Sequence, residues 1–589
     1  MTAFVRDLPF GATLLAEDRT RFRLWAPARE SVSVEIAGDK PWPMQRRSGG
    51  WFEAEAACGA GTRYRYQLGS DFAVPDPASR AQSGDVHGPS IVVDPRAYRW
   101  RHSEWRGRPW HETVLYELHV GLLGGFAGVQ AELPKLKQLG ITAVELMPIN
   151  DFPGERNWGY DGVLPFAPDH AYGSPDDLKA LVDAAHAHGL MIFLDVVYNH
   201  FGPDGNYLAS YAPQFFRADM KTPWGAAIDF RNAEVRSFFT ENALYWLIEY
   251  RFDGLRFDAV HAITEPGWLD EMAAKVRATV EVGRHVHLVL EHEGNVADHL
   301  RRNFDAQWND DAHHVLHVML TGEQEGYYGD YAARPAERLA RMLAEGFVYQ
   351  GEASAHRKGE RRGTPSGDLA PTAFVLFIQN HDQIGNRAFG ERLTTLTDPR
   401  ALEAVIALQL LCPQIPLIFM GEEDASGTPF RFFTDHHGEL ADAVREGRRR
   451  EFASFAAFAD PQRRAGIPDP NAVSTFEQSR PAPDPALGSS RRNLYRRLLG
   501  VRRDRIVPRL DGACALAPMV IGEAAVVARW RMGDGAMLTI ATNLGPATCP
   551  LTAPSGELLF ATGPTGGASA QNGQLEGRTT VAFLEAGRG

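Results

Sequence analysis

The chain has 589 residues, of which 44% are hydrophobic and 23% charged, and its formal net charge is -13. This composition is typical of a globular enzyme with two to four domains and a large core. Because a negative surface repels phosphates, we expect neither a nucleic acid nor a membrane as a partner, and a small or neutral ligand instead. Four dispersed cysteines indicate neither a disulfide framework nor a CxxC metal site.

Residues 1–105 alternate polar and apolar positions, as at 20–25 and 32–36, with glycine and proline between the runs. A period of two is typical of strands that bury one face, so we predict an N-terminal β-sandwich of the carbohydrate-binding kind. The first ten residues have neither the basic nor the apolar region of a secretory signal, and a cytoplasmic location is expected.

From about residue 111, short strands alternate with helices. Leu133, Leu136 and Leu139 form the apolar stripe of a helix that ends at Gly140. The next helix begins at 174–177, where a capping serine is followed by proline and by an acid at the third helical position.

The same pattern recurs and predicts eight strands. They lie near residues 114–119, 141–147, 190–197, 254–258, 286–291, 305–309, 373–380 and 415–420. Eight such units with helices between them predict a (β/α)8 TIM barrel over residues 106–505, an α/β fold. The stretches 198–232 and 322–370 exceed a normal loop and are interpreted as functional excursions over the mouth of the barrel.

The apolar stretch 404–420 contains two prolines and favours a buried helix followed by a core strand over a membrane span. The proline-rich stretch 467–486 is interpreted as a surface loop, because a helix near 493–503 follows it. Strand-like runs then return at 524–531, 536–543 and 579–584. A C-terminal antiparallel β-domain is therefore predicted for residues 506–589.

Three acidic residues, Asp258, Glu291 and Asp382, close apolar runs that are predicted to be buried strands. A carboxylate in such a place is costly unless pairing or function retains it. The carboxyl ends of parallel barrel strands form the active face, with neighbouring strands about 4.8 Å apart. Asp258 and Glu291 end the fourth and fifth strands, so their carboxyl groups could approach the roughly 5–5.5 Å separation of retaining glycosidases.

The residues around these acids suggest a role for each. Arg256 points to the same side of its strand as Asp258, and we expect its guanidinium to hold that aspartate ionised as a nucleophile. Glu291 must keep its proton until the leaving oxygen departs, which requires a raised pKa. Asp382, beside His381, is expected to bind sugar hydroxyls and to stabilise the oxocarbenium-like transition state.

Four segments carry a family resemblance. Residues 195–200, 254–258, Glu291 after its apolar strand and 379–382 resemble, in order, the signature regions of the α-amylase family of glycoside hydrolases. The resemblance implies that Asp258 is the nucleophile, Glu291 the acid/base and Asp382 the transition-state stabiliser. It also implies contacts to the sugar at the cleavage site; these residues are Tyr160, His200, Arg256 and His381.

Further segments, at 307–314, 381–387, 432–437 and 444–452, are similar to those of the maltooligosyltrehalose trehalohydrolases within that family, and the similarity extends over nearly the whole chain. This resemblance implies hydrolysis of the α-1,4 bond next to the terminal trehalose of a maltooligosyl-trehalose, with release of trehalose. The expected substrate-binding set then also includes His261, Asp311, His313, His314, Gln383 and Asn386. Residues 292–295, which follow Glu291, depart from the subfamily pattern. This departure affects the expected details of the sugar-binding subsites and not the catalytic glutamate.

No cofactor or metal is predicted. The adjacent His313 and His314 point to different faces, and no ligand set has zinc-like spacing. Asp195 and Asn199 match a structural calcium site of some amylases that trehalohydrolases generally lack. The arginine cluster 445–450 alternates with acids and is interpreted as a solvated helix face.

Two alternatives remain open. A glycogen branching or debranching transglycosylase would share the barrel, the acids and the N-terminal sandwich, and product analysis would distinguish it. A non-catalytic carbohydrate-binding relative would usually have lost one of the three acids, which this chain retains. The sequence does not distinguish a monomer from a homodimer, and it does not identify the residues that select trehalose over maltose.

Overall fold

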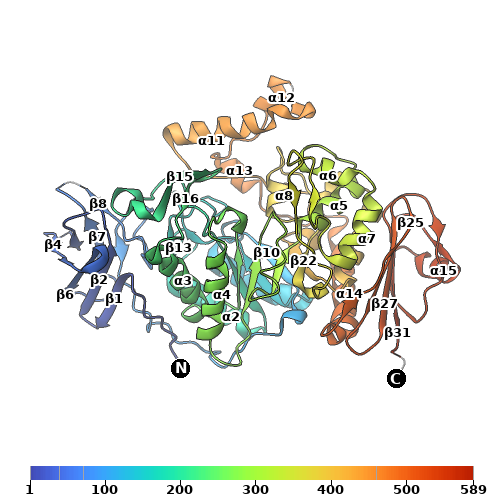
Figure 1. Ribbon diagram of the computed structural model, residues 1–589, viewed down its shortest axis with the longest axis horizontal. Helices are drawn as coiled ribbons and strands as arrows, with labels where there is room; N and C mark the ends of the chain where they lie inside the picture. The colour runs from blue at the N-terminus through green and yellow to red at the C-terminus, as the bar shows by residue number, and fades with distance from the viewer. Residues whose placement is uncertain (1, 39, 71, 459, 588–589) are drawn as a thin grey trace.

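The computed structural model describes residues 2–38, 40–70, 72–458 and 460–587. N-terminal β-sheets, a closed barrel and a C-terminal sheet follow one another along the longest axis of the molecule (Figure 1). Within these residues, none of the helices combines the length and the apolar character that a membrane crossing requires.

The central unit is a closed eight-stranded parallel barrel, as predicted. Its strands, in order around the barrel, are β10 (Leu115–Leu118), β11 (Ala143–Leu146), β14 (Met191–Val196), β17 (Gly254–Phe257), β18 (His287–Leu290), β19 (Ala306–Trp308), β22 (Phe374–Leu376) and β23 (Ile415–Phe419). β23 pairs with β10 and so closes the ring. Apolar side chains such as Met191, Phe193 and Trp308 fill the interior, which is therefore a packed core and not a pore.

Helices surround the barrel. The main ones are α1 (Gly125–Leu139), α2 (Pro175–Ala187), α3 (Ala233–Ile248), α4 (Gly267–Thr279), α5 (Asp310–Thr321), α7 (Pro335–Glu345), α10 (Pro399–Leu411) and α14 (Gly488–Val501). α2 begins with the predicted capping box, in which Ser174 Oγ accepts from the Asp177 amide at 3.2 Å and Asp177 accepts from the Ser174 amide at 2.9 Å. The stretch 404–420 is a buried helix end followed by a core strand, α10 and β23, as expected.

Long connections carry further elements above the strand ends. Residues 198–232 contain the hairpin of β15 (Phe216–Thr222) and β16 (Gly225–Ile228). Between residues 322 and 370 lie α6 (Gly329–Ala332), α7 and the short pair of β20 (Glu352–Ala353) and β21 (Arg361–Arg362). β12 (Asn150–Asp151) and β13 (Leu164–Pro168) bracket the segment that contains Tyr160.

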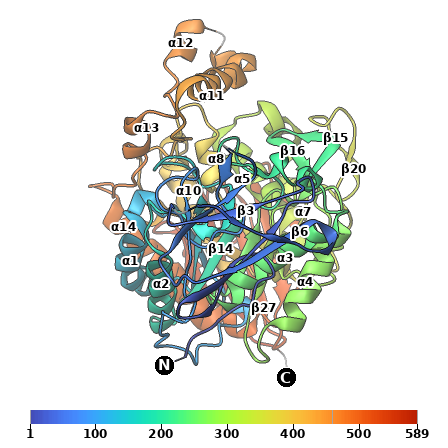
Figure 2. The same ribbon diagram turned by 90° about the vertical axis from the view of Figure 1, so that its left-hand side faces the viewer.

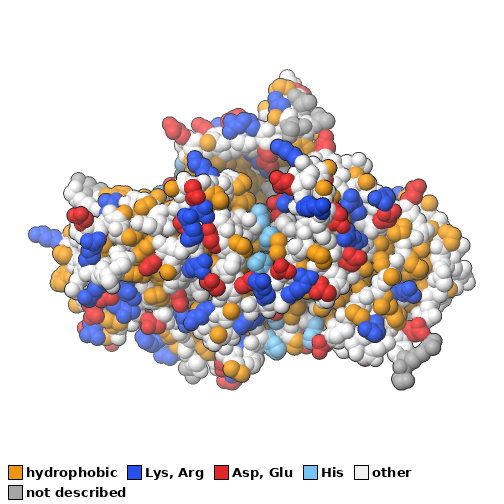
Figure 3. Space-filling model, viewed as in Figure 1, with side chains coloured by type: hydrophobic (Ala, Val, Ile, Leu, Met, Phe, Trp, Pro, Cys, Tyr) orange, Lys and Arg blue, Asp and Glu red, His pale blue; other side chains and the backbone are white. Residues whose placement is uncertain are grey.

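A helical projection rises from the same end of the barrel (Figures 1 and 2). It contains α11 (Gly438–Glu451) and α12 (Pro461–Ala465), and α13 (Val473–Glu477) lies at its base within the stretch predicted as a surface loop. Figure 3 shows a hollow in the molecule beneath this projection. Two short helices follow β22 along the chain. They are α8 (His381–Gly385) and α9 (Leu393–Leu396).

Antiparallel sheets flank the barrel. The N-terminal sheets are formed by β1 (Gly11–Ala16), β2 (Arg19–Trp25), β5 (Gln45–Arg46) and β6 (Trp51–Ala56), and by β3 (Ser33–Ile36), β4 (Trp42–Pro43), β7 (Arg63–Gln67), β8 (Ala73–Val74) and β9 (Ser90–Ile91). The C-terminal elements are β24 (Cys514–Ala515), β25 (Met519–Gly522), β26 (Ala525–Arg531), β27 (Met537–Asn543), β28 (Cys549–Pro550), β29 (Glu557–Ala561), α15 (Gly566–Gln571), β30 (Gln574–Leu575) and β31 (Thr579–Glu585). The predicted C-terminal antiparallel sheet is thus present.

Candidate active site

The three acids meet at the carboxyl end of the barrel. Asp258 directly follows β17 and Glu291 directly follows β18, and these two strands are parallel neighbours. The sequence predicts that Asp382 closes a strand. This prediction is wrong, because β22 ends at Leu376 and Asp382 lies beyond it. It lies instead in the first turn of α8, where the Asn380 side chain accepts from its backbone amide at 2.9 Å.

One buried guanidinium connects the acids on the two strands. Arg256 Nη1 lies 2.8 Å from Asp258 Oδ1 and 2.6 Å from Asp195 Oδ2, and its Nη2 lies 2.7 Å from Glu291 Oε2. The guanidinium is fully buried, with its carbon 4.2 Å from the ring centre of Trp308. Both carboxyl groups therefore contact one rigid fork and lie close to each other.

The protonation of the two acids differs from the expectation. Burial is the largest influence on Asp258 and raises its pKa well above the ordinary value; Arg256 opposes this effect and the charge of Glu291 adds to it. Burial also raises the pKa of Glu291, but Arg256 and the Ala259 amide, which donates to Glu291 at 2.8 Å, outweigh it and lower the net pKa. The expected directions are therefore wrong for this structure, because Arg256 serves both carboxylates and Ala259 donates to only one.

Tyr160 and His381 form an aromatic wall beside the acids, with ring centroids 5.1 Å apart and planes inclined by 23°. The Tyr160 hydroxyl donates to Asp195 at 2.6 Å and lies 2.8 Å from His381 Nε2. His381 Nδ1 contacts Glu117 inside the barrel. Burial lowers the pKa of His381, but Asp382 and Glu117 raise it to about 9, so the ring is an imidazolium at neutral pH.

His200 lies behind Tyr160, with its Nε2 3.0 Å from the Tyr160 carbonyl oxygen. Burial lowers the pKa of His200, which keeps this ring neutral. Trp224, at the turn between β15 and β16, stacks on His200 with centroids 5.4 Å apart and is 45% exposed. The sequence reasoning missed Trp224, although the unusual length of the insertion 198–232 was a signal.

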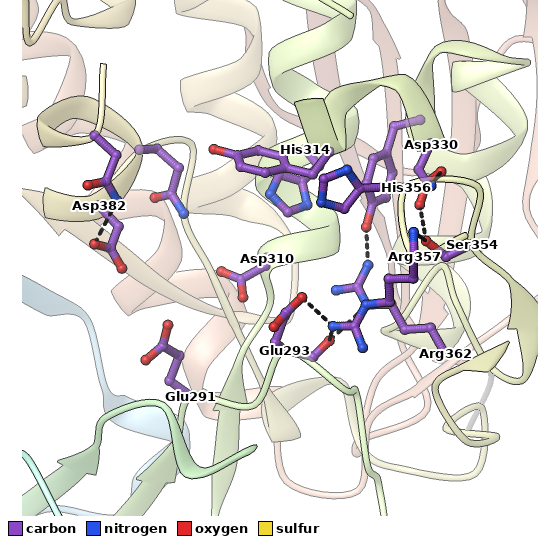
Figure 4. A pocket seen from close by; sticks show the side chains of 14 residues that line it. Glu291, Glu293, Asp310, His314, Asp330, Ser354, His356, Arg357, Arg362 and Asp382 are labelled. Atoms are coloured by element: carbon purple, nitrogen blue, oxygen red, sulfur yellow. Dashed lines mark hydrogen bonds and ion pairs between the residues drawn. The ribbon is translucent and has the colours of Figure 1, made fainter. Parts of the chain in front are cut away.

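A cavity of about 200 Å³ adjoins the acids on the Glu291 side. It is lined by Glu291, Glu293, Asp310, His314, Tyr327, Asp330, Tyr331, Ser354, His356, Arg357, Arg362, Asp382, Gln383 and Asn386. Figure 4 shows Glu291 and Asp382 on one side of this cavity, Arg357 and Arg362 on the opposite side, and Asp310 between them. Carboxylates, guanidinium groups and aromatic rings surround it, which is the lining expected for a polyhydroxylated ligand.

The other six predicted substrate-binding residues lie in three different places. His314, Gln383 and Asn386 line the cavity. His261, in the turn after β17, lies 3.5 Å from Glu293 and is 28% exposed. The last two, Asp311 and His313, are buried behind the cavity wall and do not line it.

Asp311 and His313 support the wall from behind. Asp311 accepts from the backbone amide of Val348 at 2.7 Å and pairs with Arg362 at 2.8 Å. His313 lies 2.7 Å from the carbonyl oxygen of Ile378 and 2.9 Å from the Tyr328 hydroxyl. Both side chains therefore fix the insertion 322–370 onto α5.

Most of the cavity residues that sequence reasoning missed come from that insertion. Arg357 pairs with Glu293, and the Arg362 guanidinium donates to the Glu293 carbonyl oxygen at 2.8 Å. The basic run 356–362 inside an over-long connection was the available signal. Asp310 was also missed, although it directly precedes Asp311 in a segment that the sequence reasoning had marked.

The comparisons with known proteins agree with this geometry. The family model described as "Alpha amylase, catalytic domain" matches residues 98–224, and a "Domain of unknown function (DUF3459)" matches residues 519–583. The "Malto-oligosyltrehalose trehalohydrolase" of Deinococcus radiodurans is 41% identical over 90% of either chain. The crystal structure of a putative alpha amylase from Salmonella typhimurium is 43% identical, with a TM-score of 0.92 over 98% of this chain and 100% of that one.

A branching enzyme is a more distant match. The "1,4-alpha-glucan branching enzyme GlgB" of Jannaschia sp. is 34% identical, but over only 41% of this chain and 39% of its own length.

Proposed function

This chain belongs to the maltooligosyltrehalose trehalohydrolases of the α-amylase family, and from that membership we propose a role for each residue of the site. The enzyme hydrolyses the α-1,4-glucosidic bond next to the terminal trehalose of a maltooligosyl-trehalose and releases trehalose. In the proposal Asp258 is the nucleophile, Glu291 the general acid and base, and Asp382 the group that stabilises the transition state.

The observation that carries these roles is the contact of one guanidinium with both Asp258 and Glu291 at the ends of adjacent barrel strands. A nucleophile and a proton donor must reach one glycosidic carbon and its oxygen at the same time. Two carboxyl groups held by the same fork meet that requirement. Asp382, on α8, borders the same cavity as Glu291.

In the first step, Asp258 attacks the anomeric carbon while Glu291 gives its proton to the departing oxygen of trehalose. The proton must therefore reside on Glu291, whereas the contacts described above favour its charged form. Rotation of Glu291 toward the leaving oxygen removes it from Arg256 and Ala259, which raises the pKa of Glu291. The same rotation leaves the guanidinium to Asp258 and lowers that pKa.

In the second step, Glu291 takes a proton from water, whose oxygen attacks the anomeric carbon and displaces Asp258. The developing positive charge of each transition state faces Asp382, whose carboxylate stabilises it. Tyr160 presents its ring to the sugar, and the His381 imidazolium holds that ring in place through the contact of its Nε2 with the Tyr160 hydroxyl.

The cavity on the Glu291 side is assigned to trehalose, because the protonated oxygen belongs to the leaving group and must lie beside its proton donor. Arg357 and Glu293 offer charged partners to the sugar hydroxyls, and Asp310 offers a polar one. Asp311 and His313, which were expected to touch the substrate, are assigned to positioning this wall instead.

One incubation tests the function. With maltotriosyl-trehalose as substrate, we expect trehalose and maltotriose in equal amounts, and no product from the Asp258→Asn variant. If maltotriosyl-trehalose stays intact while a parallel incubation with amylose gives a branched product, the protein is a branching enzyme instead. The first product should also retain the anomeric configuration, which proton NMR of the fresh hydrolysate measures.

Three further proposals concern the molecule as a whole. A cytoplasmic location can be checked by cell fractionation, and light scattering distinguishes a monomer from a homodimer. Limited proteolysis near residues 105 and 505 would test the predicted domain boundaries.

A further inference from the structure

A second cluster of potential ligands lies away from the acids. Asp151 ends β12, and Asp169 and His170 follow β13, its antiparallel partner. One ligand atom from each of these three side chains lies within 4.8 Å of the other two. The mechanism described above uses none of them.

The individual distances suit one shared ion. His170 Nδ1 is 3.3 Å from Asp151 Oδ1 and 4.0 Å from Asp169 Oδ1. Ligands bound at about 2.0–2.2 Å to one divalent cation lie roughly 3–4 Å from each other, so small adjustments suffice. Both aspartates are fully buried, whereas the His170 side chain is 28% exposed and leaves a path from solvent.

One carboxylate oxygen of Asp151, a member of the cluster, lacks a partner. The Asp151 side chain has no exposure to solvent, and its Oδ2 has no hydrogen-bond partner among the described residues. A buried carboxylate oxygen without a partner is costly, and a bound cation removes that cost. In contrast, both oxygens of Asp169 accept backbone amides, from Phe152 at 3.1 Å and from Ala171 at 2.8 Å.

We propose that Asp151, Asp169 and His170 bind one divalent cation of the Mn²⁺ or Zn²⁺ class. The imidazole nitrogen in the set selects against Mg²⁺ and Ca²⁺, which prefer oxygen ligands only. This inference does not depend on the proposed function, and it replaces the sequence-based expectation of no metal.

The position of the site suggests what the ion does. β12 and β13 are the two ends of the segment that carries Tyr160 to the aromatic wall. An ion that joins Asp151 to Asp169 and His170 closes the base of this segment. It therefore acts as a structural clamp, and we expect it to act on stability and not on the chemical step.

Titration of the full chain tests the site. After treatment with EDTA and dialysis, Mn²⁺ is added and the free ion is measured by its electron paramagnetic resonance signal. We expect one bound equivalent, competition by Zn²⁺, and a rise in melting temperature on addition of either ion. His170→Gln and Asp169→Asn should each weaken Mn²⁺ binding by about 100-fold or more and abolish the rise.

Glu155→Gln is the matched control, because Glu155 is an exposed acid in the same segment and outside the cluster. It should bind Mn²⁺ like the unaltered protein. His170 is partly exposed, so His170→Gln remains informative if the buried Asp169→Asn variant fails to fold. The proposal is overturned by the absence of a bound equivalent, which would mean that the contact of His170 with Asp151 closes the cluster without a metal. It is also overturned by equal binding in His170→Gln, which would mean that Mn²⁺ binds elsewhere.

Discussion

The two sides of the substrate cavity are built in different ways. On the side of the barrel strands, Arg256 is fully buried and contacts three carboxylates. On the opposite side, the Arg357 side chain is 25% exposed and pairs with a Glu293 side chain that is 53% exposed. The first side is supplied by β17 and β18, and the second mainly by the insertion 322–370.

This difference suggests a division of work. Arg256, Asp195 and Asp258 are buried and mutually hydrogen-bonded, so their arrangement is costly to change and keeps Asp258 in a fixed position. Partly exposed charges such as Arg357 and Glu293 are screened by water and each contributes little, so several together recognise a ligand. On the same side, Arg362 pairs with buried Asp311 and holds the wall in place. We therefore expect changes on the strand side to reduce kcat and changes on the insertion side to raise KM.

The largest effect is expected from Asp258→Asn, which keeps the shape of the side chain but removes the nucleophile. The rate of trehalose release should fall by about 10⁴-fold or more, on the scale of a lost nucleophile. Calorimetry should show that maltotriosyl-trehalose still binds, since the cavity wall is unchanged. A variant that retains a tenth of the activity would refute the assignment.

Glu291→Gln should lower kcat by about 10²-fold or more, because the leaving oxygen then lacks a proton donor. Trehalose release at saturating substrate measures this change. A substrate with a leaving group that needs no proton, such as a fluoride, should lose much less. Glu293→Gln is the control, two residues away on the insertion side, and should leave kcat nearly unchanged.

The strand side could largely be predicted from the sequence because its regularity is local. Each barrel strand is a short apolar run between helices, and Asp258 and Glu291 directly follow two of them. Asp382 was misplaced because residues 377–380 are buried like a strand although the ladder ends at Leu376. Periodicity reports burial and does not report pairing.

The insertion side could not be predicted, because it depends on contacts between distant segments. Arg362 reaches Asp311 across 51 positions of sequence, and neither residue shows this pairing in its own neighbourhood. The protonation of Glu291 was missed for the same reason, since the Ala259 amide that donates to it belongs to another strand end. Asp151 and Asp169 likewise lack the short spacing by which metal ligands are recognised.

A third change tests the buried network by its pH dependence. The pKa of His381 is raised to about 9, so its positive charge is present below that pH and is lost as the pH rises through it. Glu117→Gln removes one of the negative charges that raise this pKa. The alkaline limb of kcat/KM should then move to lower pH by about one unit or more, while Glu132→Gln, which changes a partly exposed acid on α1, leaves it in place.

The smallest effect is expected on the insertion side, from Arg357→Ala. Loss of this half-exposed guanidinium should raise KM for maltotriosyl-trehalose by about 3- to 10-fold, because a screened charged contact contributes on the order of 1 kcal/mol. Since Arg357 contacts neither Asp258 nor Glu291, kcat should change little. Arg361→Ala is the matched control, because Arg361 is exposed on β21 and does not line the cavity. Steady-state kinetics of both variants separates the two constants; a 100-fold loss of kcat at unchanged KM would show that the insertion takes part in the chemical step, and the proposed division of work between the two sides would fail.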